Sequence, residues 1–244
     1  MIKMVDIVIP VLNEEAALPI CIDKLFSFID DHPERVWRII VADNGSTDRT
    51  ADIAADLAND HLNVFVMHLE LRGRGRALKH AWGNSEADVR VYMDVDLSTD
   101  LRSLPDLVSA IVDDGHQIAI GSRLTNGSKV VGRTLKREIT SRCYNMMIQV
   151  LFPHTKWKDA QCGFKAISGT AAENILPLIK DNAWFFDTEL LLLADKAGYS
   201  LKEIPVQWRD DPDTRVKIIS TAWQDIKGLI RLRFKGRPVP PSAP

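Results

Sequence analysis

Short hydrophobic runs alternate with amphipathic segments through the first half of the chain. Runs rich in β-branched residues predict strands at residues 5–11, 36–42, 64–69, 89–93 and 117–121. Apolar residues recur at helical spacing over residues 15–30, from about 47 onward, over 75–84 and over 103–114. Ser46 is the expected N-cap of the second helix, with Asp48 in its first turn. This alternation indicates βαβ units, and therefore an α/β fold with a mainly parallel central sheet flanked by helices.

The second half of the chain has a less regular pattern. A polar, glycine-containing segment predicts a loop over residues 122–134. Helices are expected over residues 135–152, 168–180, 187–197 and 218–234, and strands over 161–167 and 201–208. Gly198 is a suitable helix terminator, and Pro205 favours an edge strand. We expect a single domain over residues 1–217, an amphipathic helix over 218–234 and a disordered tail over 235–244.

The composition is that of a globular protein, but its charge is unevenly distributed. The 244 residues are 45% hydrophobic and 26% charged, with a formal net charge of −2. Residues 123–142 carry a balance of +5 and residues 215–237 one of +6, so the rest of the chain carries −13. Such segregation favours anion sites on an acidic body, although basic residues also coat solvated helix faces.

Three cysteines without close spacing indicate a reducing compartment, with no disulfide framework or zinc site. The chain enters a strand-like run at once, without a signal-peptide pattern, and no window of about 18 apolar residues is present. We therefore expect a cytoplasmic protein. No nucleic-acid partner is expected.

Polar residues follow each predicted strand of the first half, and one pair of them is distinctive. Asp94 and Asp96 come directly after a mid-sheet strand. Carboxylates two residues apart on an extended chain share a side, where they repel each other unless a cation lies between them. Oxygen ligands with open positions suit Mg²⁺ or Mn²⁺ bridging substrate phosphates. Because ligands bind beyond the carboxyl ends of strands in open α/β sheets, this location favours a metal site.

The glycine-rich segment RGRGRA at residues 72–77 does not fit the common nucleotide-binding loops. It follows the third strand rather than the first and lacks the full G-x-G-x-x-G and Walker patterns. Hydride-transfer and P-loop enzymes are therefore disfavoured. The glycines still permit close backbone approach to a ligand, and the arginines are suited to phosphate.

A series of motifs resembles family 2 glycosyltransferases of the GT-A (Rossmann-like) fold. The motifs are VDIVIPVLNEE, IIVADNGSTDRT, RGRGRALKHAW, YMDVDLSTD, IAIGSR and DAQCGFKA. The segment WFFDTELLLLADKAGYSLKEIPVQWRDDPDTRVKI looks like the polyprenyl-phosphate branch, closer to dolichyl-phosphate β-glucosyltransferases than to the mannose synthases. The resemblance covers residues 4–234. It implies a metal-dependent, inverting hexosyltransferase that uses UDP-glucose or, as the alternative, GDP-mannose.

The resemblance also implies roles for residues at matching positions. Asp94 and Asp96 match the metal-binding D-x-D motif, and Ser98 stands where mannose synthases often have a glutamine ligand. The residues expected at the nucleotide-sugar donor are Pro10, Glu14, Asp43, Gly73, Asp94 and Arg215. Arg123, Lys136 and Arg137 match groups that bind the acceptor phosphate.

The nature of the acceptor decides whether a catalytic base is needed. A polyprenyl monophosphate is already anionic, since the second pKa of a phosphate monoester is about 6, and it needs no base. A saccharide hydroxyl acceptor would need a carboxylate, for which Asp159 and Asp187 are the candidates, although each also suits a helix cap. A third interpretation, from another class, is a nucleotide-sugar-binding scaffold without catalysis.

The final predicted helix suits a lipid acceptor. Its apolar positions are Ile219, Ala222, Trp223, Ile226, Leu229 and Ile230, flanked by Lys217, Lys227, Arg231, Arg233, Lys235 and Arg237. A basic amphipathic helix with tryptophan can lie in a membrane interface, but the same stripe can pack on the domain core. The helix could do both if it packs on the core along most of its length and only the end near Leu232 and Phe234 contacts lipid. We expect peripheral contact at the cytoplasmic membrane face, with a membrane protein as a possible partner.

Overall fold

The central sheet in the computed structural model has the predicted α/β architecture. The structure describes residues 3–210, 218–234, 236, 238 and 241, and for 218–220 the backbone alone. Within that part, seven strands lie in the order β3-β2-β1-β4-β7-β5-β8. Their bounds are β1 Met4–Val11, β2 Val36–Asp43, β3 Val64–His68, β4 Val89–Met93, β5 Ile118–Ser122, β7 Phe164–Ser168 and β8 Leu201–Pro205. Strand β7 is antiparallel to both neighbours, and all other pairs are parallel.

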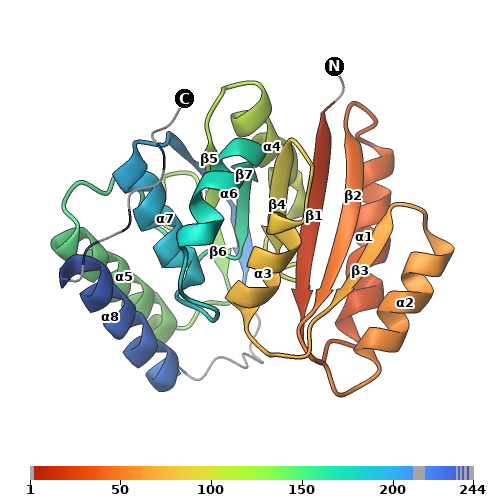
Figure 1. The fold of residues 1–244 in the computed structure, drawn as a ribbon, viewed down its shortest axis with the longest axis horizontal. Coiled ribbons are helices and arrows are strands. Elements are labelled where there is room, and N and C mark those ends of the chain that lie inside the picture. The colour runs from red at the N-terminus through yellow and green to blue at the C-terminus, as the bar shows by residue number, and fades with distance from the viewer. Residues whose placement is uncertain (1–2, 211–217, 235, 237, 239–240, 242–244) are drawn as a thin grey trace.

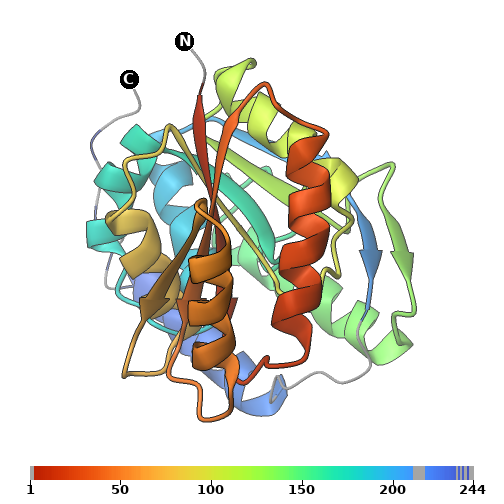
Figure 2. The same ribbon diagram turned by 90° about the vertical axis from the view of Figure 1, so that its right-hand side faces the viewer.

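Helices cover both faces of the sheet and make three layers (Figures 1 and 2). Their bounds are α1 Ala17–Asp30, α2 Thr50–Asp60, α3 Arg74–Gly83, α4 Leu104–Val112, α5 Leu135–Leu151, α6 Gly169–Ile175, α7 Phe186–Ala197 and α8 Ile218–Phe234. Helices α3, α5, α6, α7 and α8 contribute to one hydrophobic core, and α1, α2 and α4 contribute to the other. The sheet separates the cores because successive strand residues, such as Ile7 and Val8, point to opposite faces.

Most elements lie where the periodicity predicts them, but two very short strands were missed. Strand β6, Lys129–Val131, lies inside the predicted loop, and it pairs in parallel with β9, Gln207–Arg209. The single strand predicted over residues 201–208 is therefore two strands. It divides after Pro205, where the chain leaves the edge of the large sheet. Three-residue strands are too short to show a period.

The predicted start of the second helix was wrong. Helix α2 begins at Thr50, and the side chain of its N-cap residue, Arg49, makes no capping hydrogen bond. The Ser46 hydroxyl instead accepts a hydrogen bond from the Asn13 amide at 2.9 Å. The Asp48 carboxylate accepts one from the Thr50 amide at 3.0 Å. The Ser46–Asn13 bond, and a bond from the Glu15 amide to the Asp48 carboxylate at 3.4 Å, join the loops that follow β1 and β2. Local sequence does not reveal these contacts.

The other boundary differences lie in the second half. The strand predicted from residue 161 begins at Phe164, after a turn at residues 160–161 and a bend at Gly163. The helix predicted over 168–180 ends at Ile175 and continues as a 3₁₀ turn, Leu176–Leu178, which contains Pro177. Proline has no amide hydrogen to continue an α-helix. Gly198 terminates α7 in the left-handed conformation, as predicted.

Helix α8 packs one side on the core and exposes another. Leu229 and Leu232 are buried, whereas Trp223, Ile230 and Phe234 are exposed. Leu232 is thus in the core, not at a surface that meets lipid. The described helices include none that is long and apolar enough to cross a bilayer. The predicted disorder of residues 235–244 concerns a segment that lies mostly outside the described residues, as do Arg215 and Lys217.

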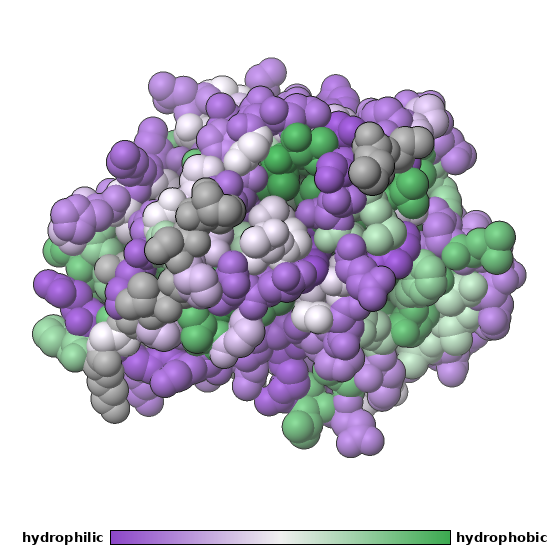
Figure 3. Space-filling model, turned by 45° about the horizontal axis from the view of Figure 1, so that its top comes forward, coloured by the Kyte–Doolittle hydropathy of each residue, from purple (hydrophilic) through white to green (hydrophobic). Residues whose placement is uncertain are grey.

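The three cysteines are free, two of them buried and Cys143 exposed. The face of the molecule in Figure 3 is largely hydrophilic, with smaller hydrophobic areas scattered over it.

Candidate active site

The carboxyl ends of the parallel strands bring several predicted polar residues to one edge of the sheet. Strands β1 and β2 end at the lower edge in Figure 1. Because β1 lies between β2 and β4, Asp43 at the end of β2 and Asp94 just beyond β4 flank the loop that follows β1. This edge is where ligands bind in open α/β sheets.

The D-x-D segment forms a tight turn beyond β4. Asp94 is partly buried and Asp96 is exposed. Leu97 has a positive φ of 53°, and the Asp96 carboxylate accepts a hydrogen bond from the Ser98 amide at 2.9 Å. Strand β9 holds the turn in place, since the Arg209 amide donates to the Ser98 carbonyl at 2.8 Å. The two carboxylates therefore project from a backbone that is fixed on both sides.

An arginine from the glycine-rich segment pairs with the first of these carboxylates. The Arg74 guanidinium lies 2.5 Å from Asp94 Oδ1. It also lies over two aromatic rings, 5.3 Å from the centre of Tyr92 and 5.0 Å from that of Trp184. Cation–π contacts with these two rings thus orient the Arg74 guanidinium towards Asp94, at the start of the D-x-D motif.

A glycine makes room for Asp94. A Cβ built on Gly163 would lie 1.8 Å from Asp94 Oδ2 and 2.5 Å from its Cγ. The Asp94 amide donates to the Gly163 carbonyl at 3.2 Å, so the two backbones are in contact. Only glycine at position 163 lets the Asp94 carboxylate take this position.

A buried polar network lies next to Asp94. Lys165 is fully buried, and its ammonium lies 2.6 Å from Asp187 Oδ1 and 3.1 Å from the Tyr92 hydroxyl. The Tyr92 hydroxyl donates to the same Asp187 oxygen. Asp187 therefore joins a buried ion pair instead of capping its helix. Burial raises the pKa of Asp94, Arg74 opposes this, and Asp96 and Asp187 add to it. A cation at the site would favour the ionised carboxylate.

Arg123, which was predicted at the acceptor phosphate, and Asp159, a predicted candidate base, bind each other. The Arg123 guanidinium donates to both oxygens of Asp159 at 2.8 Å, and its amide donates to Oδ2 at 3.0 Å. Asp159 is fully buried, and the guanidinium lies 4.8 Å from the Trp208 ring centre. Burial opposes ionisation of Asp159, but the arginine outweighs it and holds the pKa of this carboxyl below its ordinary value.

The two other basic residues predicted at the acceptor phosphate lie on the first turn of α5. Lys136 is exposed. Arg137 is partly buried, and its guanidinium lies 3.1 Å from Asp210 at the end of β9. Lys136 is therefore accessible to an anion from solvent, while Arg137 is oriented by a carboxylate.

The predicted donor residues that the structure describes lie along the same edge and contact other protein groups. Pro10 is partly buried in β1, and the Glu14 amide donates to the Thr50 hydroxyl at 2.7 Å. Asp43 is fully buried, with Oδ2 2.6 Å from His68 Nδ1. Gly73 has a φ of 150°, and a Cβ there would lie 2.3 Å from the Asn182 carbonyl oxygen. The close approach that requires glycine is thus to the loop before α7.

The oxygen ligands available at the D-x-D turn fit a hard divalent cation. Two carboxylates and the Ser98 hydroxyl offer oxygen ligands, which Mg²⁺ and Mn²⁺ prefer. No cluster of three or more His, Cys, Asp or Glu side chains placed to hold a metal occurs within the described part of the chain. Further ligands at this turn would come from substrate phosphates and water, as is usual for Mg²⁺.

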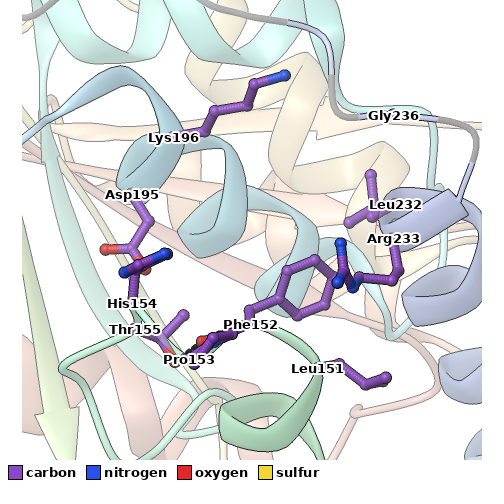
Figure 4. Close-up of a pocket in the computed structure, with 10 residues that line it drawn as sticks. All are labelled: Leu151, Phe152, Pro153, His154, Thr155, Asp195, Lys196, Leu232, Arg233 and Gly236. Carbon is purple, nitrogen blue, oxygen red and sulfur yellow. Dashed lines mark hydrogen bonds between the residues drawn. The ribbon is translucent and has the colours of Figure 1, made fainter.

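A surface pocket of about 570 Å³ lies elsewhere, between the ends of α5, α7 and α8 (Figure 4). Asp195 and Lys196, which line it, lie a few residues before the start of β8. Because β8 runs parallel to β5, the pocket is near the amino ends of these strands, opposite the edge that carries the D-x-D turn. None of the predicted site residues lines it. The chemistry of the strand ends, and not this pocket, identifies the candidate active site.

Sequence reasoning missed several residues that shape the site. Gly163, Tyr92 and Lys165 were not singled out, and Arg74 was noted only as one of several arginines in its segment. A glycine and a lysine inside a predicted strand carry no local signal of a functional role. Their importance comes from the pairing of β7 with β4, which brings Gly163 to Asp94.

A buried aspartate on α8 provides a test of the electrostatics near the site. Asp225 is 2% exposed and accepts a hydrogen bond from the Gln161 side chain at 2.8 Å, and burial raises its pKa to about 7. Between about pH 4 and pH 7 the folded chain holds this proton more tightly than the unfolded chain, so this group lowers stability as the pH rises.

We expect Asp225→Asn to be more stable than the wild type at pH 8, and the difference to shrink towards pH 4. Urea unfolding at several pH values measures this. The exposed Asp23→Asn is the control and should show no such trend. Equal destabilisation of Asp225→Asn at both pH values would contradict the expectation.

Comparison with known proteins agrees with the motifs. The family model described as glycosyl transferase family 2 matches residues 6–176. The glycosyltransferase AglD of Haloferax volcanii is 37% identical over 230 residues, which are 92% of this chain and 35% of AglD. The chain thus spans about a third of that relative's length. Dolichyl-phosphate beta-glucosyltransferase of Dictyostelium discoideum is 28% identical, with coverage of 94% of this chain and 74% of the relative.

A solved structure shares the fold. Glucosyl-3-phosphoglycerate synthase from Mycobacterium tuberculosis, in complex with Mn²⁺, uridine diphosphate and glucosyl-3-phosphoglycerate, superimposes with a TM-score of 0.73 at 18% identity. The alignment covers 96% of this chain and 81% of that one. The prediction of a GT-A-type fold, with a mostly parallel sheet flanked by helices, is confirmed.

Proposed function

The chain belongs to glycosyltransferase family 2, and on that premise we propose that it transfers glucose from UDP-glucose to a polyprenyl monophosphate, with inversion at the anomeric carbon. The observation that carries the proposal is the Asp94–Asp96 turn, fixed at the carboxyl end of a central strand by β9 and Gly163. The choice of sugar and acceptor is supported by relatives named dolichyl-phosphate beta-glucosyltransferases.

The proposed reaction is a single displacement. An oxygen of the acceptor phosphate forms a bond to C1 of glucose as the bond from C1 to the UDP oxygen breaks, and UDP leaves with the electron pair. The acceptor is already ionised near neutral pH, so the chain supplies positioning and charge instead of a base. Mg²⁺ or Mn²⁺ held by Asp94, Asp96 and Ser98 would stabilise the charge of the leaving diphosphate.

The chain's own residues have distinct proposed tasks. Lys136 and Arg137 bind the acceptor phosphate, while Pro10, Glu14, Asp43 and Gly73 shape the donor side, with Arg215 as a further donor contact. Arg123 and Asp159 hold the loop after β5 through their buried ion pair. Since both oxygens of Asp159 bind Arg123, this pairing disfavours Asp159 as a base for a saccharide hydroxyl. Residues 1–217 form the proposed catalytic unit.

The direct test is a transfer assay with the full chain. Labelled UDP-glucose or GDP-mannose is incubated with Mn²⁺ and a short-chain polyprenyl phosphate, and lipid-linked sugar is measured. We expect product from UDP-glucose. If product forms from GDP-mannose alone, the donor is GDP-mannose and not UDP-glucose. Hydrolysis of the donor without lipid-linked product would refute transfer to the polyprenyl phosphate. Binding of a donor without turnover would indicate a scaffold protein.

Lys136→Ala is expected to raise the KM for the lipid phosphate about tenfold and to leave donor binding unchanged, because a charge-assisted hydrogen bond to phosphate is lost. Lys136 is exposed, so the substitution should not affect folding. Steady-state kinetics with varied acceptor measure the effect. Lys156→Ala, another exposed lysine, is the control. An unchanged KM in Lys136→Ala would remove Lys136 from the acceptor site.

A further inference from the structure

Helix α5 carries a row of exposed apolar side chains along its whole length. Leu135, Ile139, Met146 and Val150 are 81%, 60%, 61% and 74% exposed. Their spacings of four, seven and four residues place them on one side of the helix. The buried residues of α5, Tyr144, Asn145 and Ile148, lie on the opposite side. The row therefore points directly away from the protein core.

Helix α8, which contacts α5, has a matching row. Trp223, Ile230 and Phe234 are 58%, 49% and 77% exposed and lie at spacings of seven and four. On the opposite side of α8, Leu229 and Leu232 pack in the same hydrophobic core as Ile148 of α5. Figure 1 shows the two helices side by side on one flank of the molecule. We name this flank, defined by the seven exposed apolar residues, the α5–α8 face.

The charged residues around the α5–α8 face are nearly all basic. Those with exposed side chains are Lys136, Arg142, Lys227 and Arg233. The two carboxylates of these helices face elsewhere or are paired: Glu138 binds Arg133 and Arg142, and Asp225 is buried. Among the described residues of α5 and α8, the face is thus apolar in its rows and cationic at its margins. A surface of this kind complements an anionic lipid bilayer.

We propose that the α5–α8 face is a membrane-docking surface, with α5 as well as the final helix lying in the interface of an anionic bilayer. A helix of 17 residues is about 25 Å long, so α5 presents an extended line of contact rather than a single anchor. Its apolar row begins at Leu135, next to Lys136 and Arg137. On the proposed function, docking would therefore bring the acceptor-binding end of α5 to the depth of lipid phosphates.

The test measures vesicle binding of the full chain without any substrate. Vesicles of phosphatidylglycerol and phosphatidylcholine, free of polyprenyl phosphate, are sedimented with wild type and with Ile139→Glu/Val150→Glu. We expect the wild type to bind, more weakly at high salt and on phosphatidylcholine alone, and the variant to bind at least about tenfold more weakly. The control is Ile20→Glu/Leu62→Glu, which makes the same kind of change at exposed sites outside the face.

A second measurement reports on α8. Quenching of tryptophan fluorescence by brominated lipid should occur in the wild type and be largely lost in Trp223→Phe, with vesicle binding retained. Circular dichroism melts verify that the variants fold, which their exposed positions favour.

The outcomes separate docking from catalysis. Absence of wild-type binding, or equal binding of the α5 variant and the control, would overturn the docking surface, whatever the transfer assay shows. Self-association of the wild type that the α5 variant abolishes, without vesicle binding, would assign the face to a second copy instead. Transfer to a short, water-soluble acceptor should persist in the α5 variant. Failure of that transfer in the wild type would refute the proposed function without affecting docking.

Discussion

Replacement of Gly163 with alanine is expected to reduce sugar transfer by a factor of about a hundred or more. A methyl group at this position would overlap the Asp94 carboxylate, since the built Cβ lies 1.8 Å from Oδ2. The backbone of β7 is fixed by pairing with β4 and β5, so Asp94 is the group that must move. A displacement of about 1 Å in a catalytic arrangement can cost a hundredfold in rate.

Steady-state kinetics of Gly163→Ala, Asp94→Ala and the double variant test the cause. If Gly163→Ala acts through Asp94, its effect on transfer should vanish in the Asp94→Ala background, and removal of the clash should restore stability. Gly83→Ala is the matched control, because a Cβ there meets no atom within 4 Å. Full activity of Gly163→Ala would show that the carboxylate position is not critical.

Asp159→Ala is expected to lower the free energy of unfolding by about 3–5 kcal/mol. The substitution leaves the Arg123 guanidinium, whose side chain is only 10% exposed, without its carboxylate partner. Removal of one member of a buried ion pair is costly because the remaining charge is desolvated and unpaired. Urea unfolding followed by circular dichroism measures the loss.

The control for Asp159→Ala is Lys3→Ala, which breaks the exposed pair with Asp88 and should cost about 0–1 kcal/mol. Because the pKa of Asp159 is lowered by folding, its stabilising contribution is complete above about pH 4 and is lost as the pH falls further. The difference in the free energy of unfolding between Asp159→Ala and the wild type should therefore become smaller below about pH 4. A loss as small as that of Lys3→Ala would mean that the ion pair is not structural.

The sequence pattern was sufficient for the first five strands of the sheet because each is a short run of apolar residues, and the first four are each followed by a helical period. Their order implied the edge at which Asp43 and Asp94 would lie. The direction of β7 was not predictable, since an apolar run has the same composition whether it pairs in parallel or antiparallel. Strands β6 and β9 were missed because three residues do not display alternation.

The partners of the site residues were harder to predict than their positions. Considered alone, Arg123 suits phosphate binding and Asp159 suits base catalysis. They are 36 residues apart, so the ion pair between them is apparent only once the chain is folded. Arg74 and Asp94 are 20 residues apart and come from loops after different strands. Tertiary contact, not residue type, decides which charges in this protein are available to a ligand.

The insertion of β7 into the middle of the sheet has a consequence for how the chain folds during synthesis. Strand β5 pairs only with β7 and β8 among the described strands, and both follow it in sequence. A nascent chain that ends before Phe164 therefore has a buried-type strand, Ile118–Ser122, with no neighbour to pair with. The long-range pairing that completes the sheet is intrinsically slow to form and leaves apolar strand edges open to aggregation until then. Removal of the second half should thus yield an aggregation-prone fragment instead of an independent nucleotide-binding unit.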